Sequence, residues 1–247
     1  MFLEKINLIK KLSILALLII VSALILSACN INVIRGNGKM TNAELPVVDD
    51  IKKIELKDVS ATLNISAEKS SKITYKADEN LKDFLNVEIN NGLLKISSKS
   101  SKILGINNKI VFNIGTDMLE EISVKSGAVI NGTGTFTAKT FTINVDGASK
   151  INLKLDSDKV ILNVNGAAEV NLFGKTKEFK MNSNGAINVK CKELKADNVS
   201  IDFDGTGNIE VYAGKNLTVE GNGVCSIKYW GSAVVNGKAK GIVKIGN

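Results

Sequence analysis

The feature that most constrains the fold is a short phrase that recurs through the second half of the chain. Its copies read DGASKIN, NGAAEVN, NGAINVK, DGTGNIEV and GNGVCSIKY. Each copy carries one anchor glycine, and the anchors, separated by 19, 19, 20 and 18 residues, are Gly147, Gly166, Gly185, Gly205 and Gly223. Such a period is typical of repeat architectures, in which one copy cannot bury its apolar face alone and stacked copies share a core.

Apolar residues lie at alternate positions on both sides of each anchor glycine. In the copy around Gly166 they are Val160, Leu162, Val170 and Leu172. A period of two is that of a β-strand with one buried face. We therefore predict an all-β fold, a parallel β-helix or solenoid with coils of about 19 residues, in which the anchor glycines are structural turn residues. A right-handed coil is expected, because parallel crossovers are right-handed in most proteins.

The residue before each anchor glycine is small and polar. This set is Asp146, Asn165, Asn184, Asp204 and Asn222. In a stack these turn-favouring side chains are expected to form a ladder. A cation shared by Asp146 and Asp204 is rejected, because three coils would separate them by roughly 14 Å. We predict no metal site and no cofactor.

The first 29 residues resemble a bacterial lipoprotein signal. Three lysines form a basic start, an almost unbroken apolar stretch covers residues 12–25, and residues 26–29 read Leu-Ser-Ala-Cys. By this resemblance, cleavage falls between Ala28 and Cys29, and acyl chains on Cys29 tether the protein to the outer face of the cell membrane, or to an outer membrane where one exists. The alternative is an uncleaved anchor or an ordinary secretory signal.

The middle of the chain shows short strand patterns and a hairpin signature. Asn90-Asn91-Gly92 is the expected hairpin turn, and Asp78 begins a single helical turn that ends near Phe84. The expected strands are Lys53–Leu56, Ala61–Ile65, Lys72–Lys76, Phe84–Ile89, Leu93–Ser97 and Ile110–Ile114. The predicted parts are a signal peptide (1–28), a tether (29–43), an N-terminal β region that caps the stack (44–118), and repeats with a C-terminal cap (119–247).

Two cysteines, Cys191 and Cys225, remain once Cys29 is assigned to the signal. They fall in different columns of the repeat and two coils apart, beyond disulfide reach, so both are expected to be buried free thiols. The formal net charge is +7, but the lysines are dispersed, which favours an ordinary solvated surface. Nucleic acid is not an expected partner, because no basic run is interleaved with aromatic residues.

The chain contains no histidine. This removes His-dependent nucleophiles, His-ligated zinc and the commonest general base. The acidic pairs Asp49-Asp50 and Glu120-Glu121 are sequence neighbours, and neighbouring strand residues point to opposite faces. We predict that the protein is not an enzyme, and a carbohydrate-active β-helix enzyme is the least favoured alternative.

Several phrases outside the repeat follow one another in a fixed order. They are Gly36-Asn37-Gly38, Asp50-Ile51-Lys52-Lys53-Ile54, Asp78 with Asn80 and Leu81, Asn91-Gly92 with Leu94 and Ile96, and Tyr229 with Gly231. In this order they resemble the head GIN domain family of auto-transporter adhesins over residues 36–247. Ile51 stands where the family has an aromatic residue, and the family's G-S-G turns are approached at 205–207 and 221–223. The resemblance implies an exported, largely parallel β-helical domain, often lipid-anchored, without established catalytic residues.

Aromatic residues near the C-terminus are the candidate partner-binding residues. Tyr212 and Trp230 alternate with core positions, so we expect them to face solvent, where aromatic rings can stack on sugars; capping of the last coil is the alternative. The main functional prediction is a lipid-anchored, non-catalytic envelope protein that binds a polymer, glycan, lipid or protein, as an adhesion module would. A structural or envelope-maintenance spacer that self-assembles into an oligomer is the second hypothesis.

Overall fold

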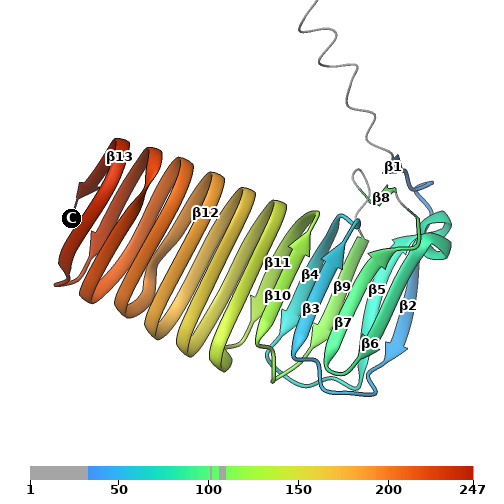
Figure 1. The fold of residues 1–247 in the computed structure, drawn as a ribbon. Coiled ribbons are helices and arrows are strands. Elements are labelled where there is room, and N and C mark those ends of the chain that lie inside the picture. The colour runs from blue at the N-terminus through green and yellow to red at the C-terminus, as the bar shows by residue number, and fades with distance from the viewer. Residues whose placement is uncertain (1–32, 101, 106–109, 247) are drawn as a thin grey trace, which may run out of the picture. The chain divides into compact units, whose positions relative to one another are not determined.

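The computed structural model describes residues 33–100, 102–105 and 110–246. The described fold is all-β, as predicted, with one short helix, η1 (Glu79–Phe84). The strands are β1 (Val33–Ile34), β2 (Met40–Pro46), β3 (Lys53–Lys57), β4 (Ala61–Ser66), β5 (Lys72–Asp78), β6 (Leu85–Asn90), β7 (Leu93–Ser98), β8 (Ile103–Leu104), β9 (Ile110–Gly115), β10 (Glu121–Lys125), β11 (Gly127–Thr133), β12 (Phe136–Trp230) and β13 (Val234–Gly246) (Figure 1).

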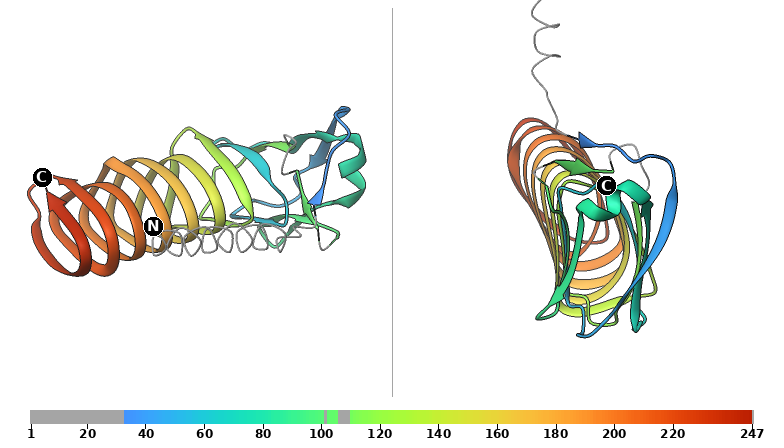
Figure 2. Two further views of the ribbon diagram at one scale, coloured as in Figure 1. Left: turned by 90° about the horizontal axis from the view of Figure 1, so that it is seen from above. Right: turned by 90° about the vertical axis from the view of Figure 1, so that its right-hand side faces the viewer.

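The expected strands of the N-terminal region are all present. The predicted hairpin joins β6 and β7 as an antiparallel pair. Asn91 and Gly92 both have positive φ, 50° and 77°, which is the backbone of the tight turn that matches strand twist. The predicted helical turn is η1, and its Leu81 side chain is completely buried. Figure 2 shows η1 lying across the N-terminal end of the stacked strands.

The sheet begins at Met40, which lies inside the predicted tether of residues 29–43. Residues 40–43 belong to β2, which pairs antiparallel with β5 from Met40 opposite Asp78 to Pro46 opposite Lys72. Asn80 also accepts a hydrogen bond from the main-chain N–H of Asn37 (2.9 Å). The polar composition of this segment suggested a linker, but its exposed side chains alternate with half-buried ones along an edge strand.

The large sheet is mixed rather than parallel throughout. Parallel pairs join β3 to β7 and β10, β4 to β9 and β11, and β12 to β10, β11 and β13. Antiparallel pairs are β2 with β5, β5 with β9, and β6 with β7. The sheet crosses the predicted boundary between residues 118 and 119 without a break, and Val33–Asn247 form one compact unit.

Along β12 the chain returns beside itself after every 18 to 20 residues, and we call each such stretch a winding (Figure 1). Side-chain amides mark the spacing: Asn163 donates to Asn144 (2.9 Å) and Asn182 donates to Asn163 (2.7 Å). The predicted ladder before the anchor glycines contributes a link from Asn165 to Asp146 (3.1 Å). The longer amide rows lie three residues before and five residues after the anchor glycines.

The anchor glycines stack on one another. Each has a positive φ, for example 136° at Gly205. A Cβ placed at Gly205 would meet the carbonyl oxygen of Gly185 in the previous winding. The column ends at Gly147, which lies over Ser126 rather than Gly127 in the preceding winding. Glycine is therefore required by close backbone approach as well as by conformation.

The interior of the windings is a continuous apolar core. The column six residues before the anchor glycines is buried in every winding, with exposed fractions of 2 % or less: Phe141, Val160, Phe179, Val199 and Leu217. Cys191 and Cys225 are buried free thiols. Burial raises the pKa of the Cys191 thiol to about 12 and that of Cys225 to about 11, so both stay protonated and unreactive near neutral pH.

Candidate functional site

The predicted lipidation and cleavage residues, Cys29 and Ala28, lie outside the described residues. The anchor glycines sit in the stacked backbone column described above and present no side chain. No helix within the described ranges is both long and apolar enough to cross a membrane. The side chains that can contact a ligand are therefore those at the outward positions of the windings.

The predicted aromatic residues lie on one outward column, seven residues after successive anchor glycines. Tyr212 and Trp230 occupy this column and are both partly exposed. The ring of Tyr212 is also near Gly231, which follows Trp230. Phe173 occupies the same column two windings earlier and is 39 % exposed. Lys192 fills the position between Phe173 and Tyr212, and we call these four residues the aromatic stripe.

Phe173 was missed at the sequence level, although the repeat contained the signal. It follows Gly166 by seven residues, as Tyr212 follows Gly205 and Trp230 follows Gly223. Phenylalanine at this place looked like an ordinary apolar residue next to the core position Leu172. Since neighbouring strand residues face opposite sides, a buried Leu172 requires Phe173 to point outward.

Two lysine ammonium groups are held over the rings of the stripe. The Lys192 Nζ lies 5.6 Å from the centroid of the Trp230 ring, and the Lys195 Nζ lies 4.0 Å from that of Tyr212. Both distances are within the range of cation–π attraction. Neither ammonium group forms an ion pair with a carboxylate in the part of the chain that the structure describes, and Lys195 donates to the main-chain oxygen of Lys192 at 3.4 Å. The stripe and the adjoining Lys195 thus present two positioned positive charges.

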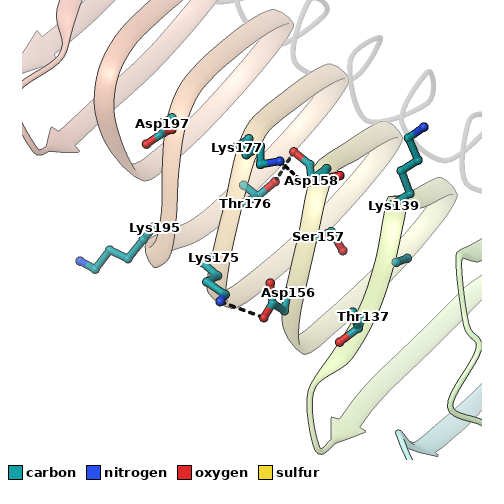
Figure 3. Close-up of a pocket in the computed structure, with 11 residues that line it drawn as sticks. Thr137, Lys139, Asp156, Ser157, Asp158, Lys175, Thr176, Lys177, Lys195 and Asp197 are labelled. Atoms are coloured by element: carbon teal, nitrogen blue, oxygen red, sulfur yellow. Dashed lines mark hydrogen bonds and ion pairs between the residues drawn. The ribbon is translucent and has the colours of Figure 1, made fainter.

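Lys195 also belongs to a charged groove of about 560 Å³ that runs beside the stripe. Figure 3 shows its charged side chains on four successive windings. Four lysines (Lys139, Lys175, Lys177, Lys195) and three aspartates (Asp156, Asp158, Asp197) line it. The groove is also lined by small side chains, among them Ser157, whose buried Oγ has no hydrogen-bond partner among the described residues.

Most charges of the groove are already compensated. Lys175 pairs with Asp156 at 3.1 Å, and Lys177 pairs with Asp158 at 2.7 Å. The hydrogen bond from Lys177 lowers the pKa of Asp158, and the same bond raises the pKa of Lys177, so both remain charged near neutral pH. Among the described residues Lys139 and Lys195 have no carboxylate within ion-pair distance, which leaves the excess positive charge of the groove at its two ends.

The acidic pairs considered for catalysis have structural partners. Asp49 accepts a hydrogen bond from the main-chain N–H of Gly92 (2.9 Å), and Asp50 forms an ion pair with Lys69. Glu121 forms an ion pair with Lys53 (3.1 Å). Within the described part of the chain no group of three or more His, Cys, Asp or Glu side chains is placed to hold a metal ion.

Residues 50–233 match the family described as "Putative auto-transporter adhesin, head GIN domain". The chain belongs to this family. The matched range includes the phrases from Asp50 onward and the closing Tyr229 and Gly231. No curated protein matches the chain.

Solved structures share the fold at low sequence identity. A "putative adhesin" from Bacteroides fragilis is 22 % identical, with a TM-score of 0.76, and the match covers 87 % of this chain and 99 % of that one. A "putative adhesin" from Parabacteroides distasonis is 20 % identical, with a TM-score of 0.65 and coverages of 87 % and 100 %. A "putative lipid binding protein" from the same species is 19 % identical, with a TM-score of 0.64 and coverages of 87 % and 98 %.

Proposed function

We propose that this head GIN protein is a lipid-anchored, non-catalytic module of the bacterial surface that binds an anionic polymer of the cell envelope through its aromatic stripe. The observation that carries the proposal is the pair of ammonium groups of Lys192 and Lys195 held over Trp230 and Tyr212. The adhesin names of the family and of its structural neighbours support a binding role.

The architecture we propose for the second half of the chain is a parallel, right-handed β-solenoid with coils of about 19 residues. Parallel pairing of β12 with β10, β11 and β13 supports it. The stacking of Gly205 on Gly185 and of Gly223 on Gly205 supports one coil per sequence repeat. In such an array each outward position of the repeat recurs on every coil and forms a column, which suits recognition of a long polymer at several points.

The stripe favours an anionic ligand for an electrostatic reason. A lysine over an aromatic ring keeps its charge while losing part of its conformational freedom, so binding an anion costs less entropy than it does for a mobile lysine. Phosphate and carboxylate groups are the envelope anions that would use these donors. Phe173 adds exposed apolar surface in the same column, which suits the carbon skeleton of a polymer.

The double variant Lys192→Gln/Lys195→Gln tests the proposal. Binding of poly(glycerol phosphate) and of polygalacturonate should weaken by roughly tenfold or more, since each lysine near a polyanion is worth about 1 kcal/mol. The salt dependence of binding should also become shallower. Trp230→Ala should weaken binding as well, because it removes the ring beneath the Lys192 ammonium group.

Lys175→Gln is the matched control, because Lys175 lies in the adjoining groove but is neutralised by Asp156. It should change binding less than twofold. Vesicles of an anionic phospholipid form a further arm, since one structural neighbour is described as lipid-binding. Equal loss in the control and the double variant, or no binding of any polyanion by the wild type, would contradict the proposal.

The lipid anchor is a separate part of the proposal. Cys29→Ser removes the thiol to be acylated, so the protein should no longer partition into the detergent phase and should be released or left unprocessed. Metabolic labelling with an alkyne fatty acid, followed by phase separation, measures both effects. Cys191→Ser is the control, because a buried thiol is not available for acylation. Continued labelling of the Cys29→Ser variant would rule out this anchor.

A self-assembling spacer is less well supported. The sheet order ends at β2 on one side and at β6 on the other, and both form antiparallel pairs that interrupt the parallel stacking. The last strand, β13, pairs with β12 and carries the exposed lysines Lys238 and Lys240. Edge lysines oppose the addition of a further strand.

A further inference from the structure

A second groove on the windings carries amide groups instead of aromatic rings. It has a volume of about 340 Å³ and is lined on four successive windings. One wall is formed by Asn144, Asn163, Asn182 and Asp202, and the other includes Asn165, Asn184 and Asp204. None of these residues belongs to the aromatic stripe or to the charged groove. We call this feature the amide groove.

The first wall is held in place by a directional row of hydrogen bonds. Asn182 donates to Asn163 (2.7 Å), Asn163 donates to Asn144 (2.9 Å), and Asn144 donates to Glu121 (3.2 Å). Asn144 and Asn163 each spend one N–H and one acceptor position on their neighbours, whereas within this row Asn182 spends one N–H alone. A primary amide has two N–H donors and two acceptor positions, so all three keep one N–H and at least one acceptor position for a ligand.

The donor end of the row has a hydrogen-bond acceptor as its partner, whereas the acceptor end faces a residue that cannot donate. At the donor end it meets the Glu121 carboxylate, which is the appropriate partner. At the other end the Oδ1 of Asn182 faces the next winding, where the equivalent residue, 20 positions on, is Asp202. A carboxylate has no hydrogen to donate. Asn182 Oδ1 and Asp202 thus form a surplus of acceptors on this wall, and the Asp204 carboxylate adds acceptors on the opposite wall.

A second amide row shows what a completed structural row looks like. Asn171 donates to Asn152 (2.6 Å), and the row continues through Asn131, Asn64 and Asn113 to the hydroxyl of Thr74. One winding beyond Asn171 the equivalent residue is Lys190, which is a donor and a cation. A hydroxyl lies at one end of this row and a potential donor at the other. Asn64 and Asn113 line a separate hollow of about 380 Å³, whereas Asn152 and Asn171 line neither that hollow nor the amide groove.

We infer that the amide groove binds a neutral, linear oligosaccharide, whose hydroxyl groups donate to the surplus acceptors and accept from the remaining amide N–H groups. Three features carry this choice. Paired donor and acceptor positions repeat at one strand spacing, about 4.8 Å, which suits a ligand whose hydroxyls are both donors and acceptors. The carboxylates of Asp202 and Asp204 oppose an anionic chain, so the ligand differs from that of the aromatic stripe. The groove extends over four windings, which suits a chain rather than an ion.

The test uses the full-length protein in detergent and three uncharged probes: cellohexaose, chitohexaose and maltohexaose. Binding is followed by ligand-observed NMR and calorimetry. We expect at least one hexamer to bind, and Asn182→Ala to weaken that binding roughly fivefold, the usual effect of losing one polar contact. Asn171→Ala is the matched control, because it removes an equally short amide link from the completed row. It should leave binding within twofold.

Three results would overturn the inference. None of the hexamers binds the wild type; Asn171→Ala weakens binding as much as Asn182→Ala; or the groove takes up calcium instead, with binding lost in Asp202→Asn. The polyanion assay keeps the two proposals apart. Asn182→Ala should leave polyanion binding unchanged, and Lys192→Gln/Lys195→Gln should leave hexamer binding unchanged.

Discussion

Replacing Gly205 by alanine is expected to destabilise the protein by about 4 kcal/mol, near the upper end for single substitutions. A Cβ at this position would meet the carbonyl oxygen of Gly185 in the neighbouring winding, and backbone cannot move aside as a flexible side chain can. The φ of 136° adds strain, because residues with a Cβ rarely adopt it. Urea unfolding followed by circular dichroism measures the loss.

Gly214→Ala is the control for this prediction. Gly214 lies in the same winding as Gly205, but a Cβ there would have only ordinary contacts, the nearest at 3.5 Å from the carbonyl oxygen of Ala196. Its stability should stay within about 0.5 kcal/mol of the wild type. Equal unfolding midpoints for the Gly205→Ala and Gly214→Ala variants would show that the glycine column does not require close backbone approach.

Phe179→Ala is expected to cost about 3–5 kcal/mol, because it opens a cavity in the continuous core. Phe179 is 2 % exposed and belongs to the buried column that includes Phe141 and Leu217. The neighbouring windings are joined by main-chain hydrogen bonds, so they have little freedom to close the space. Chemical denaturation of the variant and the wild type provides the measurement.

Phe173→Ala offers an unusually close comparison, since it removes the same side chain six residues earlier. Phe173 is 39 % exposed, so its loss should change the free energy of unfolding by less than about 1 kcal/mol. As a member of the aromatic stripe, it should instead weaken polyanion binding. The two substitutions should therefore separate stability from binding, and a large loss of stability in Phe173→Ala would place that residue in the core.

The elements predicted best were those fixed by local chemistry. Asn91 and Gly92 carry the backbone preference of a tight hairpin turn, and the alternation around each anchor glycine depends on the period of a strand. The beginning of the sheet was predicted less well. The pairing of Met40 with Asp78 is a contact over nearly forty residues, and the polar composition of β2 gives no sign of it.

The candidate sites depended on relations between windings, which sequence spacing alone does not give. Tyr212 and Trp230 were predicted as outward aromatics, but the positions of Lys192 and Lys195 over their rings depend on side-chain conformation. The amide groove was not predicted either. The sequence pattern predicted a ladder of the residues directly before each glycine, whereas the hydrogen-bonded row includes Asn163 and Asn182, three residues before.

The alternation of charge in the groove beside the stripe also bears on how the windings find their correct order during folding. Lys139, Asp158, Lys177, Asp197 and Lys215 follow one another on successive windings, with ion pairs of 2.7 Å between Lys177 and Asp158 and 2.9 Å between Lys215 and Asp197. Each exposed pair contributes little to the stability of the native state. Nearly identical windings could, however, stack out of sequence with little loss of core packing. Skipping one winding would set lysine against lysine and aspartate against aspartate, so the alternating column selects against misregistered and domain-swapped stacks.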